Sequence, residues 1–196
     1  MTLVSCIVEG HGEVAAIPVL LRRIARWRSP DVQIEIQRPI KVHRNRFLNR
    51  DAEFARHLEL ASHKCGDDGW VLVVLDADDD CPVSLGTSIL DRARRVIPHR
   101  ALSVVLPTRE FEAWFIGAAK SLNGHRGLTI EEADLVADPE VPRNAKGWIS
   151  ERMADRSYGE TTDQPAFAAM MDMEEALDRC RSFRKLCDEW DRKFGV

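Results

Sequence analysis

The stretch from Val71 to Asp80, VLVVLDADDD, joins five consecutive aliphatic residues directly to a run of acids. A strand without polar alternation is typical of a sheet covered on both faces, as in α/β proteins with parallel strands. The acids at Asp76, Asp78, Asp79 and Asp80 carry like charges close together, which opposes folding unless something neutralises them. A surface turn needs one or two acids rather than four, so the segment raises the question of which cation, if any, lies there.

Apolar runs and helical periodicity alternate along the first 120 residues. Strands are predicted over 2–8, 32–37, 71–75 and 101–107, the second as an edge strand, and helices over 14–27, 51–64, 84–95 and 109–120. This order predicts an α/β fold, a mainly parallel four-stranded sheet with helices on both faces. Beyond it we expect short helices at 128–136 and 143–153, a loop at 157–167 and a long helix at 171–193. We therefore divide the chain into a core, 1–120, and a helical extension, 121–196, packed together as one structural domain.

Composition narrows the class of protein. The 196 residues carry a net charge of −4, and the amino-terminal segment lacks the basic and long apolar regions of a signal peptide. No window approaches the roughly 18 apolar residues of a membrane span, so we expect no membrane association. The five cysteines form no Cys-x-x-Cys pair, which favours a cytoplasmic protein and argues against zinc.

Carboxylates follow two of the predicted strands. Glu9 comes directly after the first strand, and Asp76 and Asp78 follow the third. If these strands are neighbours, the three side chains meet at one edge of the sheet, where ligands of parallel sheets bind. Oxygen ligands of this kind suit Mg²⁺ or Mn²⁺. Three further acids are candidate ligands, although each also suits an ordinary turn or first helical turn: Asp80, Glu110 and Glu112.

Two other features belong to the same predicted edge. Gly10 and Gly12 precede a helix, whose amino terminus favours phosphate, so they are candidates for a phosphate-binding loop. The segment 38–50 holds five Lys or Arg residues and no acid, in an expected loop. Four of these basic residues are candidates for contacts to a nucleic-acid backbone: Arg38, Lys41, Arg44 and Arg46.

The motifs IVEGHGE (7–13, ending at Glu13) and VVLDADDD (73–80) resemble the Toprim domain of topoisomerases, primases and overcoming-lysogenisation-defect nucleases. The segments LPTREFEAWFIG and YGETTDQPAF look like those of a bacterial Toprim-like family of unknown function. The resemblance implies magnesium-dependent phosphodiester chemistry at Glu9, Asp76 and Asp78. Tyr158, the only tyrosine, lies outside the Toprim-like part, which argues against a complete topoisomerase. A nuclease acting on DNA is the remaining expectation, and the resemblance also suggests a separate ATPase partner.

Three alternatives stay open. The chain could be a non-catalytic module that binds nucleic acid or a protein partner. It could be a phosphatase of the haloacid dehalogenase type, in which Asp76 would be the nucleophile, although Asp80 stands where that motif expects Thr. Glu9 could simply cap the helix after it, with the aspartates forming an ion-free turn.

Overall fold

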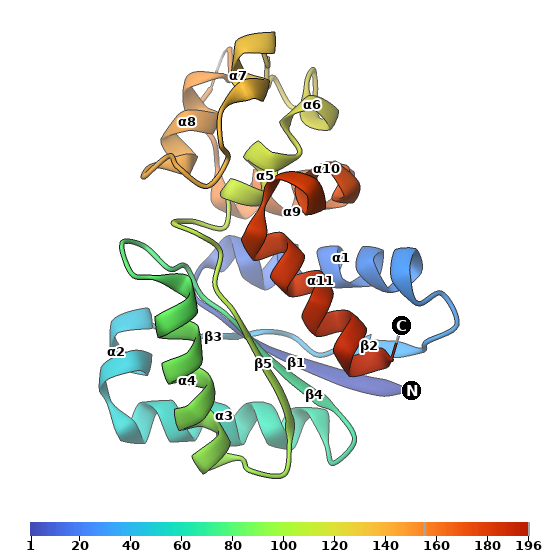
Figure 1. Cartoon of the computed structure of the whole chain (residues 1–196), viewed down its shortest axis with the longest axis vertical. Coiled ribbons are helices and arrows are strands. Elements are labelled where there is room, and N and C mark those ends of the chain that lie inside the picture. The colour runs from blue at the N-terminus through green and yellow to red at the C-terminus, as the bar shows by residue number, and fades with distance from the viewer. Residues whose placement is uncertain (155, 196) are drawn as a thin grey trace.

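A parallel β-sheet forms the centre of the molecule (Figure 1). The computed structural model describes residues 1–154 and 156–195. Within them the sheet has the order β2-β1-β4-β5, and the short β3 also pairs with β1. The strands are β1 (Thr2–Val8), β2 (Ile34–Ile36), β3 (Ile40–Lys41), β4 (Trp70–Val74) and β5 (Ala101–Val105). All pairings are parallel, and Ile7 lies beside Val73, so β1 and β4 end together. The predicted α/β class and the edge position of β2 are confirmed.

Helices cover both faces of the sheet because successive strand residues point to opposite sides. Helices α1 (His11–Arg28) and α11 (Arg181–Phe194) pack on the face that carries Val4, Cys6, Leu72 and Val74. The other face, with Val71 and Val73, packs against α2 (Arg44–Asn49), α3 (Asp51–Cys65) and α4 (Pro82–Val96). Every residue of β4 is therefore buried against helices on one face of the sheet or the other, which explains its uninterrupted apolar sequence.

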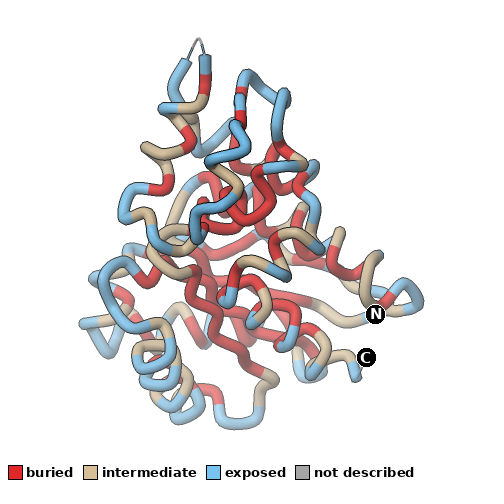
Figure 2. Tube along the Cα trace, turned by 45° about the horizontal axis from the view of Figure 1, so that its top comes forward, coloured by how far each residue is buried: buried red, intermediate tan, exposed pale blue. Residues whose placement is uncertain are grey.

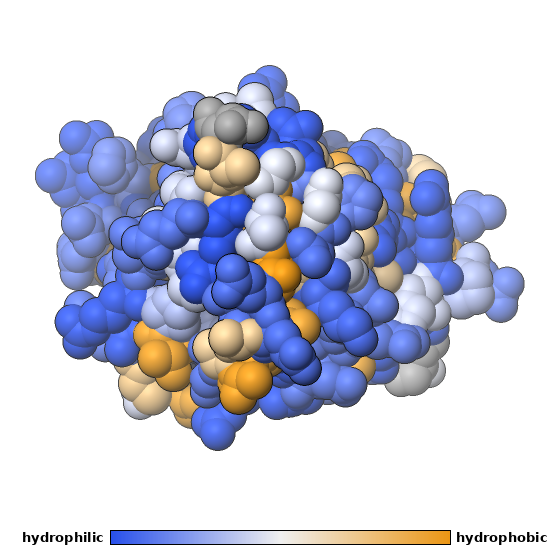
Figure 3. Space-filling view, turned by 90° about the horizontal axis from the view of Figure 1, so that it is seen from above, coloured by the Kyte–Doolittle hydropathy of each residue, from blue (hydrophilic) through white to orange (hydrophobic). Residues whose placement is uncertain are grey.

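Six short helices gather beyond the carboxyl ends of the strands, in the upper part of Figure 1. They are α5 (Ala113–Gly117), α6 (Ala119–Leu122), α7 (Glu132–Val136), α8 (Ala145–Glu151), α9 (Glu160–Met170) and α10 (Met173–Arg179). The buried apolar residues of all of these helices except α7, which has none, belong to the same cluster as β1 and α1, and buried chain continues from the sheet into this region (Figure 2). From above, this end is mostly hydrophilic with small separate apolar areas (Figure 3). The extension therefore lies over the sheet edge where the candidate residues are.

Four local predictions differ from the structure. The expected loop at 38–50 contains β3 and α2, and the expected loop at 157–167 becomes α9 from Glu160 onward. The helix predicted over 109–120 begins only at Ala113, because Arg109 has a left-handed backbone with φ of 66°. The long final helix is broken at Cys180, whose extended backbone, with φ of −111° and ψ of 118°, separates α10 from α11. In these segments, contacts with the rest of the fold decide the secondary structure, and the local sequence pattern does not.

No helix in the described ranges combines the length and the apolar composition that crossing a bilayer requires.

The contact between α1 and α9 gives the first prediction. A Cβ atom on Gly12 would lie 2.2 Å from Oε1 of Gln164 and 2.5 Å from the carbonyl oxygen of Glu160. Gly12→Ala should therefore lower the free energy of unfolding by about 1–3 kcal/mol, because α9 must move away. Gly86→Ala in α4 is the control: its Cβ would meet only Cδ1 of Leu106, at 3.8 Å. It should stabilise the fold by roughly 0.4–1 kcal/mol. Urea unfolding measures both, and equal effects would contradict this packing.

Candidate active site

Glu9 and Asp76 emerge from neighbouring strands at the same edge of the sheet. β1 ends at Val8 and β4 at Val74, and the two strands pair in parallel. The Glu9 carboxyl is half-buried, and burial, followed by the charges of Glu13 and Asp78, raises its pKa to about 7. Burial also raises the pKa of Asp76 well above its ordinary value, and Glu13, Glu112 and Glu9 add to this. These carboxyls therefore lie close enough to disfavour one another's charge.

Glu13 closes the turn between β1 and α1. Its Oε2 accepts hydrogen bonds from the backbone N–H groups of Glu9, at 2.9 Å, and Gly10, at 3.0 Å. The side chain is buried, and burial raises its pKa although the two N–H donors lower it. In the predicted phosphate-binding loop, the backbone N–H groups of Glu9 and Gly10 thus already donate to a carboxylate of this chain. Gly12 is buried under α9, so close helix packing is a sufficient reason for that glycine.

Asp76 is fixed by the loop after β5. Its Oδ1 accepts a hydrogen bond of 2.8 Å from the backbone N–H of Phe111, and the residue is 8% exposed. The loops after β4 and β5 also pair through their backbones, since the N–H of Ala77 donates to the carbonyl of Pro107 at 3.0 Å. This pairing orients Asp76 toward the other carboxylates.

Glu112 and Lys146 complete the buried group. Glu112 is fully buried and accepts a hydrogen bond of 3.1 Å from Nε2 of Gln164. Nζ of Lys146, from α8, lies 3.7 Å from Oε2 of Glu112 and 3.6 Å from Oε1 of Glu160. Burial raises the pKa of Glu112 to about 7, although Lys146 lowers it. Burial alone would lower the pKa of Lys146, but the surrounding carboxylates, Glu112 first, raise it.

Glu110 has a supporting position beside this group. Its Oε2 accepts a hydrogen bond of 3.0 Å from the backbone N–H of Lys146. It therefore holds the start of α8 in place, next to Glu112. Of the two acids predicted in this turn, Glu112 is the one that points into the buried group.

Four oxygen atoms in this region are buried without a hydrogen-bond partner among the described residues: Oε2 of Glu9, Oε2 of Glu112, Oε1 of Gln164 and the hydroxyl of Tyr158. Of these, Oε2 of Glu112 has the ion pair with Lys146, and the Tyr158 hydroxyl lies beside it. Leaving a buried acceptor unpaired costs about 1–3 kcal/mol, and native proteins rarely do so without a reason. Unpaired oxygens of this type are the donors that Mg²⁺ and Mn²⁺ prefer, so the donor set fits such an ion. Across 1–154 and 156–195, however, no three carboxylate, His or Cys side chains form a complete metal-ligand set. An ion here would keep several water ligands, as Mg²⁺ commonly does.

The remaining acids form an exposed loop, Asp78–Asp80, held mainly by Arg44. Nη1 of Arg44 lies 3.2 Å from Oδ2 of Asp78, and Nη2 lies 2.7 Å from Oδ2 of Asp80. Nε of Arg44 donates to the carbonyl of Asp76 at 3.0 Å. The Arg44 side chain is only 12% exposed, so this predicted phosphate contact serves to order the acid loop.

The other predicted phosphate contacts are exposed. Lys41 ends β3 at the same edge of the sheet, and its Nζ lies 2.7 Å from Nε2 of His11 at the start of α1. Arg38 and Arg46 also reach the surface. Lys41 is therefore the basic candidate whose side chain lies beside the turn that follows Glu9.

Residues 8–190 match the sequence profile of a domain of unknown function, DUF4276. The chain belongs to the DUF4276 family. The matched range includes Glu9, Asp76, Glu112 and Lys146. No curated protein and no solved structure matches the chain.

Sequence reasoning missed Glu13, Lys146 and Gln164 of this DUF4276 chain. Glu13 had a local signal, because it stands three residues after the helix cap Gly10, the spacing of a capping box. Lys146 and Gln164 had none, since they reach the site only through the packing of α8 and α9. The hydroxyl of Tyr158 is buried beside Glu112, and burial together with the charge of that carboxyl raises its pKa.

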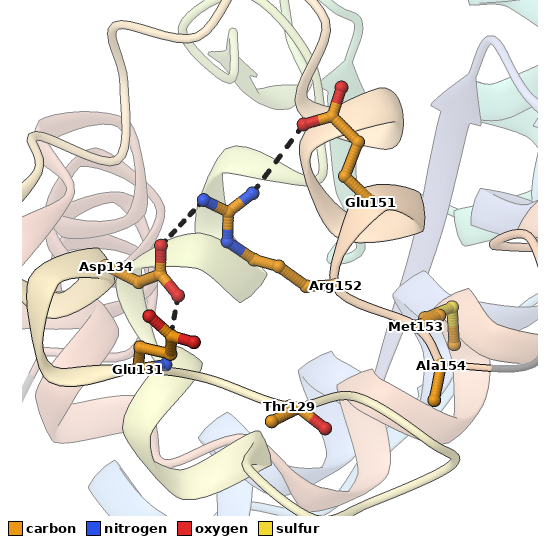
Figure 4. Close-up of a pocket in the computed structure, with 7 residues that line it drawn as sticks. All are labelled: Thr129, Glu131, Asp134, Glu151, Arg152, Met153 and Ala154. Atoms are coloured by element: carbon orange, nitrogen blue, oxygen red, sulfur yellow. Dashed lines mark hydrogen bonds and ion pairs between the residues drawn. The ribbon is translucent and has the colours of Figure 1, made fainter.

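A separate pocket of about 470 Å³ lies within the helical extension of the DUF4276 chain (Figure 4). Arg152 reaches between two acids there, Asp134 at 2.6 Å and Glu151 at 3.8 Å. The guanidinium also lies 3.7 Å from the ring of Trp148. These contacts satisfy the charge of Arg152 internally, and none of the predicted site residues lines this pocket.

The raised pKa of Glu9 gives a prediction on pH. Folded Glu9 holds its proton up to about pH 7, whereas the unfolded chain releases it near the ordinary 4.5. The folded state therefore binds more protons between these values, and the free energy of unfolding falls as pH rises through them. Between these pH values and in chelator, the free energy of unfolding of Glu9→Gln should fall by about 1–2 kcal/mol less than that of the wild type. This magnitude allows for the partial exposure of Glu9. Denaturant unfolding from pH 4.5 to 8 measures it, with the exposed Glu59→Gln as a control that should leave the profile unchanged.

Proposed function

We propose that this DUF4276 chain is a Mg²⁺-dependent nuclease that cleaves phosphodiester bonds of DNA. The observation that carries the proposal is the group of buried and half-buried carboxyls at the ends of β1, β4 and β5, in which one oxygen of Glu9 and one of Glu112 accept no hydrogen bond from the described residues. A structural role does not require acids that raise one another's pKa in a buried place. A divalent cation bound there would coordinate those oxygens, and its charge would favour the ionised form of the neighbouring carboxyls.

The candidate ligands of the ion are Glu9, Asp76, Asp78 and Glu112. No three of them converge among the described residues, so water would complete the coordination of the ion. When bound, Mg²⁺ supplies Lewis-acid stabilisation of the charge on the phosphate and lowers the pKa of a coordinated water. Glu9 would either bind the ion or, with a pKa of about 7 in the ion-free protein, accept a proton from the attacking water near neutral pH. The ammonium group of Lys146 is placed to stabilise negative charge that develops on a phosphate oxygen. Lys41 would hold the backbone of the nucleic acid near the same edge.

The Toprim resemblance is part of this proposal. It is supported by the position of a glutamate after the first strand and an Asp-x-Asp after the adjacent strand, at one edge of a parallel sheet. A separate ATPase partner is proposed only from that resemblance. The phosphatase alternative is disfavoured by the burial of Asp76 and its hydrogen bond to Phe111, because a nucleophilic carboxylate must reach the phosphorus atom.

One observation favours a non-catalytic nucleic-acid-binding module as the second candidate. Lys146 already pairs with Glu112, and Arg44 already pairs with Asp78 and Asp80. The chain thus neutralises part of its acidic group without an ion. Metal binding and cleavage distinguish this candidate from a nuclease.

Metal binding should appear as a gain in stability. At 100 times the dissociation constant, Mg²⁺ or Mn²⁺ should add about 2.7 kcal/mol to the free energy of unfolding. Asp76→Asn keeps the oxygen that accepts from Phe111 but removes a buried negative charge, so in chelator it should be at least as stable as the wild type at pH 8. The variant should lose most of the metal-dependent gain, whereas Asp67→Asn, at an exposed position, should keep it. Equal thermal shifts in all three proteins would argue against ligation by Asp76.

Cleavage is the direct test. The purified protein should nick or degrade DNA with Mg²⁺ or Mn²⁺ and stop when a chelator is added. Glu9→Gln should abolish cleavage and leave DNA affinity nearly unchanged, because Glu9 contacts no backbone phosphate in this scheme. Lys146→Gln should lower the rate roughly 10²–10³-fold, the usual effect of removing one group that stabilises transition-state charge. The exposed Lys120→Gln is the control.

DNA binding without cleavage under every metal would favour the non-catalytic module, and unchanged cleavage by Glu9→Gln would place the activity elsewhere.

A further inference from the structure

Two further arginines contact the acid loop, at Asp79 rather than at the two acids that Arg44 binds. The exposed carboxylate of Asp79 pairs with Nη1 of Arg109 and lies 3.5 Å from Nη2 of Arg143. Arg109 comes from the loop after β5, and Arg143 from the segment before α8. One carboxylate therefore joins two cations from distant parts of the sequence, directly beside the candidate active site.

The backbone around Arg109 holds this arrangement in a strained form. Arg109 and Asp78 both have left-handed backbones, with φ of 66° and 51°. The N–H of Asp78 donates to the carbonyl of Arg109 at 3.0 Å, and Nη1 of Arg109 donates to the carbonyl of Asp78 at 3.1 Å. Residues other than glycine rarely adopt this conformation, and such residues gather at functional sites. The two loops thus fix the guanidinium of Arg109 at the carboxyl edge of the sheet.

A cleft of about 360 Å³ opens at the same place. Arg109 lines it, together with four acids, Asp78, Asp79, Asp80 and Glu140. Its volume falls within the range of small-ligand sites. Because Asp78 belongs both to this cleft and to the predicted metal site, a chain bound in the cleft would continue into the carboxylate group.

We propose that Arg109 and Arg143 bind a backbone phosphate of the nucleic acid, and that Asp79 occupies the place of that phosphate in the free protein. This inference rests on the proposed function for the class of substrate. Guanidinium groups bind carboxylates and phosphates with the same geometry, so one can replace the other. Exposed ion pairs add little to stability, and the side chain of Asp79 is 73% exposed, so a phosphate displaces it easily. Arg44, which is 12% exposed and binds backbone carbonyls as well as acids, is not available in this way.

Asp79→Asn tests the proposal through binding alone, in chelator, so that no cleavage is needed. Asp67→Asn is the matched control: it makes the same change in net charge and releases another arginine, Arg100, at the opposite end of the strands. With a fluorescent DNA duplex, Asp79→Asn should bind roughly 3- to 10-fold more tightly at low salt. The log–log salt dependence should become steeper by up to about 0.9, the value for the one phosphate that the freed arginines neutralise. Asp67→Asn should bind like the wild type.

Three further variants separate an effect on binding from an effect on folding. Arg143→Gln, at an exposed position, should weaken binding in the wild-type background, whereas Arg22→Gln, exposed on α1, should not. The combination Asp79→Asn with Arg109→Gln and Arg143→Gln should remove the increase in affinity.

The outcomes separate this inference from the proposed function. If Asp79→Asn binds no more tightly than Asp67→Asn, the inference is wrong, even where the wild type cleaves DNA. It is also wrong if neither the wild type nor Asp79→Asn binds nucleic acid. If Asp79→Asn binds more tightly and no protein cleaves with any metal, the arginine site stands and the nuclease proposal fails.

Discussion

The whole arrangement depends on the placement of one ammonium group among four buried or half-buried carboxyls. Lys146 lowers the pKa of Glu9, Glu13, Asp76 and Glu112 alike. Burial raises all four pKa values, and their mutual repulsion adds to this for Glu9 and Asp76. The fold tolerates this concentration of acids because α8 delivers a cation and the turn before α1 delivers two backbone donors to Glu13. This compensation is only partial, because one oxygen of Glu9 and one of Glu112 accept no hydrogen bond in the part of the chain that the structure describes.

The sheet and its acidic edge were predictable because both depend on short-range patterns. The apolar run before Asp76 requires burial on both faces, and buried parallel strands place their carboxyl ends together. Glu9 and Asp76 follow from that reasoning without any knowledge of tertiary contacts. The metal-ligand role assigned to them stays a prediction.

The other half of the site had no local signature. Lys146 lies 70 residues beyond Asp76 in a segment whose periodicity indicates only a short helix. Gln164 lies on α9, in a stretch whose Gly and Thr residues suggested a loop. The composition of the segment 38–50 favours phosphate binding, but it also suits a guanidinium that neutralises the chain's own acids, as Arg44 does for Asp78 and Asp80. Pairing between charges far apart in sequence is decided by packing, which a single sequence does not display.

The dense packing of α9 on α1 has a consequence for how the protein is made. The strands that carry Glu9 and Asp76 leave the ribosome first, and α8 and α9 follow only after about 70 further residues. Until then the carboxyls lack the ammonium group of Lys146, and α1 lacks its cover. A nascent chain of this protein therefore carries an uncompensated acidic surface during synthesis. The group of side chains at this edge is complete only when the later helices pack over it, so its proposed activity would belong to the finished fold alone.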